Sequence, residues 1–163
     1  MLCDTVRGNV FVDDPARYAA KERDEVELSW RDCTRRAVRA TSRTGRKIGI
    51  LLPLGEQARH GDVVYEDDHA VVFVTLRPCE VIVAEFAEAG ALARAALELG
   101  NLHVPVEATG RLQLITLPNG PAAGVIDRHA SASRREVRRF EPLRATVVGN
   151  EVRTANGFRV TKA

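Results

Sequence analysis

The chain has 163 residues, a net charge of +2, 45% hydrophobic residues and 28% charged residues. This composition allows a packed core and excludes a globally disordered chain. Lysine and arginine are spread along the sequence, so nucleic acid is not the expected main partner. The apolar runs are short, which predicts no membrane span. The absence of a signal pattern, and of any CxxC pair among Cys3, Cys33 and Cys79, favours a cytoplasmic protein with free thiols.

Residues 1–77 predict an N-terminal all-β domain. Apolar Val26, Leu28 and Trp30 alternate with polar residues, which is typical of a half-buried strand. Gly45 lies in a hairpin turn at a position that favours a positive φ. Other strands are expected in residues 1–12, 37–41, 47–52, 62–66 and 70–76. Short strands with regularly spaced turns predict a small barrel or sandwich.

The pattern changes over residues 78–143. An apolar strand at 81–84 is followed by apolar positions at helical spacing over 86–99, and Gly100-Asn101 then predicts the end of the helix. The next expected elements are strands at 103–108 and 111–117, a helix at 122–132 and a strand at 135–140. The order β-α-β-β-α-β predicts a ferredoxin-like domain, and hence an α+β protein. Residues 144–163 are expected to form a short tail without a histidine-rich run.

Four histidines are candidates for chemistry, but no two of them form a local HxH, HxxxH or HExxH pair. No cysteine lies near any of them, so a closed zinc site within one chain is not expected. The sequence also has no GxSxG motif and no phosphate-binding glycine loop, so we expect no enzymatic activity. His60 is expected to be solvated in a polar loop, and His69 to lie in a hairpin turn.

His103, at the exit of the predicted first helix, has two interpretations. It either forms a hydrogen bond near the C-terminus of the helix, where the macrodipole favours its charged form, or it is a metal ligand. One imidazole makes a weak, open site, whereas a two-fold axis would bring a second copy of His103 to the same ion. Imidazole suits nickel, copper and zinc. His129, near the end of the predicted second helix, is a candidate auxiliary ligand.

Several motifs together resemble a known family. They are residues 26–32 (VELSWRD), 45–50 (GRKIGI) with Leu52-Pro53, 61–68 (GDVVYEDD), Leu99-Gly100-Asn101 with His103 and Pro105, and Phe140-Glu141-Pro142. In this order and spacing the sequence resembles the UreE-type urease accessory proteins, which are nickel metallochaperones. The resemblance covers nearly all of residues 1–143.

The resemblance implies a homodimer joined through the C-terminal domain. His103 would face its symmetry mate across the dimer axis, with one nickel ion held between them, and zinc or copper could bind there in vitro. Nickel would pass to an accessory GTPase and then to apo-urease, while the N-terminal domain contacts partner proteins or peptide segments.

Two departures from the family pattern matter. Leu102 stands where the family usually has an arginine before the histidine. The further metal-binding histidines of many members are absent from residues 117–120 and from the tail at 154–163. The sequence therefore predicts about one metal ion per dimer and no nickel storage.

Two alternatives remain open from the residues alone. The first is a metal-independent interaction module, whose N-terminal β domain takes a peptide by strand addition. The second is an RNA- or ribosome-associated β-barrel protein, suggested by the basic segment from Arg35 to Lys47. The second is the weaker, because no aromatic stacking platform accompanies these basic residues.

Overall fold

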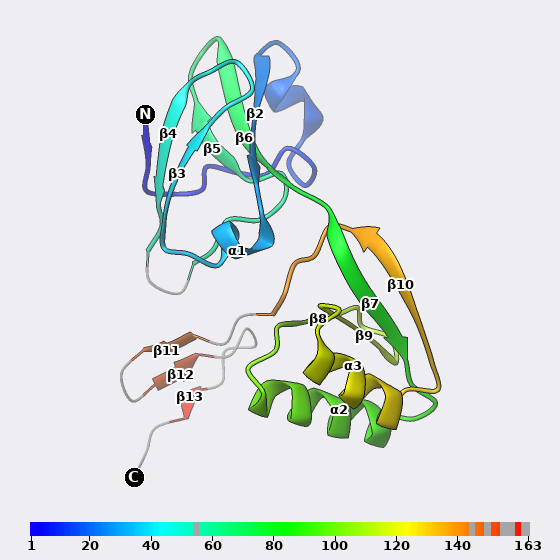
Figure 1. Ribbon diagram of the computed structural model, residues 1–163. Coiled ribbons are helices and arrows are strands. Elements are labelled where there is room, and N and C mark those ends of the chain that lie inside the picture. The colour runs from blue at the N-terminus through cyan, green and yellow to red at the C-terminus, as the bar shows by residue number, and fades with distance from the viewer. Residues whose placement is uncertain (54–55, 144–145, 149–150, 154–158, 161–163) are drawn as a thin grey trace. The chain divides into compact units, whose positions relative to one another are not determined.

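The computed structural model describes residues 1–53, 56–143, 146–148, 151–153 and 159–160 (Figure 1). Helices and sheets occur together, so the predicted α+β class is confirmed. The described residues form two compact units, one built on Met1–Arg77 and the other on Pro78–Leu143. Among the helices of the described residues, none combines the length and the apolar character needed to cross a membrane.

Residues Met1–Arg77 of the first unit contain two three-stranded sheets, ordered β2-β6-β5 and β1-β4-β3. Their strands are β1 (Leu2–Cys3), β2 (Glu22–Leu28), β3 (Ala37–Thr41), β4 (Lys47–Leu51), β5 (Val63–Glu66) and β6 (Ala70–Leu76). Inward-facing residues of both sheets, including Val26, Ile48, Ile50 and Val74, form one buried cluster. Every second residue of β4 therefore faces this core, and the others face outward.

The unit also contains two short helices, so its description as all-β is incomplete. They are the 3₁₀ helix Pro15–Tyr18 and the helical turn α1 (Trp30–Cys33). The predicted strand stops at Leu28, because the side chains of Ser29 and Asp32 form a capping box that starts α1. Trp30 was predicted to continue the strand, and this was wrong. The turn glycine Gly45 has φ 91°, as predicted.

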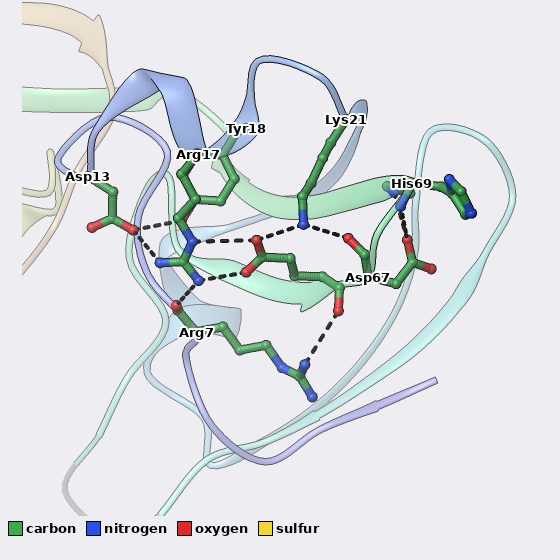
Figure 2. Close-up of polar contacts among 9 residues, drawn as sticks. Arg7, Asp13, Arg17, Tyr18, Lys21, Asp67 and His69 are labelled. Atoms are coloured by element: carbon green, nitrogen blue, oxygen red, sulfur yellow. Dashed lines mark hydrogen bonds and ion pairs between the residues drawn. The ribbon is translucent and has the colours of Figure 1, made fainter.

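A cluster of polar contacts fixes the loop before β2 onto β5 (Figure 2). Glu66 of β5 accepts hydrogen bonds from Arg17 Nη2 at 2.6 Å and from Lys21 Nζ at 2.9 Å. Arg17 also donates to Asp13, and Asp13 accepts the Tyr18 hydroxyl at 2.6 Å. Burial, together with this hydrogen bond, raises the pKa of Tyr18 to about 12. The polar side chains of this cluster bind one another, so the cluster stabilises the loop on β5.

The second unit consists of a four-stranded sheet and two helices. The elements are β7 (Cys79–Glu85), α2 (Ala89–Asn101), β8 (Val106–Ala108), β9 (Gln113–Thr116), α3 (Gly120–His129) and β10 (Ala132–Arg138). The sheet order is β10-β7-β9-β8, and each neighbouring pair is antiparallel. Residues of both helices and of the sheet share one core, which includes Ile82, Leu99, Leu114 and Ile126. Both helices therefore pack on the same face of the sheet.

The bounds of the second helix differ from the prediction. It begins at Gly120, where the Asn119 side chain accepts the N–H of Ala122 and Pro121 occupies the first turn. It ends at His129, because Ala130 has an extended backbone conformation and β10 begins at Ala132. In the tail the structure describes β11 (Thr146–Val148), β12 (Glu151–Arg153) and β13 (Arg159–Val160), which pair antiparallel. The remaining tail positions lie outside the described residues.

Candidate metal centre

His103 closes the C-terminal end of α2. Its backbone N–H donates to the Gly100 carbonyl at 3.0 Å, and the N–H of Val104 donates to the Leu99 carbonyl at 2.9 Å. This pair of bonds defines a Schellman motif, in which His103 occupies the first position beyond the cap. Leu99 and Val104 lie in the same buried cluster and supply the hydrophobic contact of that motif. The end of the helix is therefore fixed on the core.

The predicted helix end and the predicted strand start both need correction. Gly100 and Asn101 are the last helical residues, not the cap, and Leu102 is the cap residue. His103 belongs to the Schellman turn, because β8 begins only at Val106. Sequence reasoning assigned the turn to the glycine that helix ends favour, but the hydrogen bonds close three residues later.

His103 is the only non-glycine residue with a positive φ, at 53°, in the described part of the chain. Glycine usually fills this position, because a Cβ in the left-handed region costs about 1 kcal/mol. The chain thus places a histidine where backbone energetics favour glycine. Local strain of this kind is common at functional sites, and here it fixes the direction in which the imidazole leaves the helix.

The His103 side chain is exposed, and among the described residues its imidazole has no hydrogen bond or ion pair. No group of three histidine, cysteine, aspartate or glutamate side chains that could hold a metal ion occurs in the described ranges. Within one chain, His103 is therefore a single donor with open positions around it.

An exposed apolar stripe on α2 precedes His103 in the sequence. Gly90, Ala93, Leu97 and Gly100 follow one another at helical spacing, and all are exposed. The Leu97 side chain is 66% exposed, and a Cβ at Gly100 would meet no heavy atom within 4 Å. Leu102, at the cap, is 50% exposed and extends the apolar surface towards His103. This face of α2 allows close approach of another backbone.

His129 lies at the end of α3 in a different environment. Its Nε2 lies 2.7 Å from Glu98 Oε1 of α2, and its side chain is only 16% exposed. Arg128 forms an ion pair with the other oxygen of the same carboxylate. The hydrogen bonds from His129 and Arg128 lower the pKa of Glu98. No described contact joins His129 to His103, so its role as an auxiliary ligand stays a prediction.

The Glu98 clasp, formed by Glu98, Arg128 and His129, was missed by sequence reasoning. Glu98 lies on the predicted first helix, and the two cations lie at the end of the second, 30 and 31 residues further along the chain. Basic residues in the last turn of a helix suit the helix dipole, but Arg128 and His129 give no sign in the sequence of a partner on another helix.

The other histidines and the cysteines have structural roles. His60 was expected to be solvated, but it is half-buried, stacks on Phe11 at 4.7 Å and accepts the Leu76 N–H at Nδ1. His69 lies in the turn after Asp67, as predicted, and donates its N–H to that carboxylate. All three cysteines are free thiols, as predicted. Burial raises the pKa of the Cys3 thiol, which disfavours the reactive thiolate.

Comparison with known proteins identifies the class. A sequence model described as the N-terminal domain of the UreE urease accessory protein matches residues 6–77. The chain is 30% identical to the urease accessory protein UreE of Bacillus cereus over 107 residues, which cover 66% of this chain and 71% of that protein. It is 35% identical to UreE of Haemophilus influenzae over 119 residues, or 72% of this chain and 63% of that protein. The chain belongs to the family of UreE urease accessory proteins.

Two facts define how far these comparisons reach. The chain spans only 50% of the UreE protein of Actinobacillus pleuropneumoniae, to which it is 38% identical over 96 residues, and 63% of the Haemophilus relative. The family-model match ends at residue 77, so it covers the first unit and not the residues around His103. A urease accessory protein is not itself the enzyme, which confirms the prediction that this chain is not one.

Proposed function

We propose that this protein is a dimeric nickel carrier that delivers nickel for assembly of the urease active site. The observation that carries the proposal is His103, an exposed imidazole without a protein partner in the described residues, at a backbone position that favours glycine. Among the described residues the imidazole makes no hydrogen bond or ion pair that would offset the cost of the Cβ at that position. A ligand whose direction must be fixed gains a rigid base, because the Schellman turn is anchored by Leu99 and Val104.

The ion is shared between two protomers. One imidazole leaves most coordination positions open, and a two-fold axis through the site supplies a second His103 without any further residue. The exposed stripe of Gly90, Ala93, Leu97 and Gly100 supports a dimer through α2, since small residues allow helices to approach closely. The sheet order β10-β7-β9-β8 supports a ferredoxin-like domain over residues 78–143 that carries this interface.

The mechanism is ligand exchange and involves no bond-making chemistry in a substrate. Nickel binds the neutral imidazole, so affinity falls as His103 takes up a proton. Two imidazoles and solvent leave the ion accessible to stronger ligands, which suits delivery to the accessory GTPase and the apo-urease complex in the cytoplasm. Zinc and copper compete for the same nitrogen donors in vitro. The first unit, residues 1–77, binds the partners.

The test is a nickel titration by calorimetry of the wild-type chain and of His103→Ala. We expect about one ion per dimer and at least ~100-fold weaker binding in the variant, with unchanged circular dichroism and dimerisation. His69→Ala is the matched control, because His69 is also exposed and lies in the other unit. Wild-type affinity in His103→Ala would overturn the proposal, and so would several tight ions per chain.

A further inference from the structure

The outward face of the β1-β4-β3 sheet carries a groove of about 390 Å³ in the first unit. Its lining includes Met1, Arg39, Thr41, Lys47 and Gly49. We call it the Gly49 groove. Ala40 and Ile48 also line the groove, although their side chains pack against the core on the other side of the sheet. The groove is therefore a feature of the sheet surface, separate from the candidate metal centre.

Gly49 forms the floor of the groove. It is the middle residue of the central strand β4, paired with Leu2 on one side and Arg39 on the other. Its φ is not positive, so the backbone would accept a side chain there, and a Cβ would reach Leu2 at 3.5 Å, an ordinary contact. Glycine in a strand interior costs about 0.5–1 kcal/mol, and one use that offsets this cost is close approach of a ligand or another backbone.

The cations of the groove lack carboxylate partners. In the part of the chain that the structure describes, the Arg39 guanidinium has no hydrogen bond or ion pair, and Lys47 Nζ donates only to Thr41 Oγ1 at 3.0 Å. The neighbouring arginines of the same hairpin differ: Arg43 lies 3.8 Å from Glu25, and Arg46 lies 3.6 Å from Glu22. The positive charge of the hairpin is thus compensated outside the groove and left uncompensated inside it.

The surroundings of the floor are aliphatic. Met1, Leu2 and Leu51 are 45%, 68% and 41% exposed, and Leu2 and Leu51 lie on the same outward face as Gly49. No aromatic residue occurs among the lining residues, so the surface lacks the stacking platform of single-stranded nucleic-acid sites. Aliphatic side chains beside two cations instead match an extended segment that carries an aliphatic residue with carboxylates two positions before and after it, because residues i and i+2 of an extended segment share a face.

We propose that the Gly49 groove binds an acidic, extended segment of a partner protein. An aliphatic side chain lies over Gly49 between Leu2 and Leu51, and flanking carboxylates pair with Arg39 and Lys47. The proposal rests on the proposed function, in which the first unit binds partners, and it identifies the surface and the chemistry of the bound segment.

The test is fluorescence anisotropy of a labelled peptide of about eight residues, in which an aliphatic residue has acidic residues two positions before and after it, titrated with the full chain. We expect saturable binding that weakens with salt and a roughly tenfold loss in Arg39→Glu. Gly49→Val should lose a similar factor by filling the floor while keeping every charge, and valine favours the strand. Arg43→Glu is the matched control, because it changes the same charge on the same hairpin outside the groove. It should bind like wild type.

Three results would overturn the proposal. They are equal binding of a peptide with lysine in place of the acidic residues, equal losses in Arg39→Glu and Arg43→Glu, and preferential binding of an RNA oligonucleotide. Nickel titration of the same samples separates this proposal from the metal site. Arg39→Glu should bind nickel normally, and His103→Ala should bind the peptide normally.

Discussion

Each helix of the second unit has a histidine at or just beyond its C-terminal end, and the surroundings of the two histidines differ. His103 follows α2 at φ 53°, is exposed and has no side-chain partner among the described residues. His129 ends α3 in helical conformation, with a side chain 16% exposed and Nε2 2.7 Å from Glu98. Both lie near the C-terminal end of a helix, so this position alone does not distinguish the proposed ligand from a histidine that is bound to a neighbouring side chain.

The difference concerns which ring nitrogens are available to a metal ion at each site. His129 contributes its ring to the contact between α2 and α3, so Nε2 is engaged by Glu98 and a metal ion could bind without displacing Glu98 only through Nδ1. His103 contributes only its backbone to the fold, through the Schellman hydrogen bonds. Its imidazole makes no hydrogen bond or ion pair with the described residues, and its positive φ lowers the free energy of unfolding. Substitutions at the two sites should therefore separate stability from nickel binding.

The largest expected effect on stability follows His129→Ala. Loss of the contact with Glu98 should lower the free energy of unfolding, measured as a lower urea midpoint. Nickel affinity should stay within a factor of about two of wild type. A loss of nickel affinity as large as that of His103→Ala would instead make His129 a ligand and remove the contrast between the two sites.

His103→Gly should stabilise the protein. Glycine adopts positive φ without a Cβ penalty, so the free energy of unfolding should rise by about 1 kcal/mol while nickel binding is lost. His103→Ala is the control, because alanine keeps the Cβ and loses the imidazole. If the glycine variant is no more stable than the alanine variant, His103 is not strained.

The smallest effect is the pH dependence of the Glu98 clasp. The hydrogen bonds from His129 and Arg128 hold the pKa of Glu98 below its ordinary value. Ionised Glu98 therefore stabilises the fold above the unfolded pKa of about 4.3, and this contribution disappears as the pH falls through the lowered pKa. The urea midpoints of wild type and Glu98→Gln should differ near neutral pH and converge as the pH falls below the lowered pKa. A constant difference would show that ionisation of Glu98 does not contribute.

Much of the fold was predictable, because periodicity and turn residues act locally. The alternation around Val26, the hairpin glycine Gly45 and the helical spacing before Leu99 all correspond to observed elements. The failures arose where one local signal overrode another. The capping box of Ser29 and Asp32 ended a strand that Trp30 would have continued. Gly100 is helical because His103, three residues later, is the residue with positive φ that ends the helix.

The candidate site was predictable only in part. The position of His103 between a helix and a strand pointed to it as a ligand, but its strained backbone depends on hydrogen bonds that no sequence pattern displayed. The partner of His129 could not be foreseen, because Glu98 lies on another helix and meets it only after packing. The same holds for Arg39, whose missing partner is apparent only beside the ion pairs of Arg43 and Arg46.

The central claim is that His103 from each of two protomers holds one nickel ion. Anomalous scattering at the nickel absorption edge from nickel-loaded crystals tests it most directly. The account predicts one strong peak per dimer, on the two-fold axis and within coordination distance of both His103 imidazoles. A peak at His129, or separate peaks on each protomer away from the axis, would contradict it.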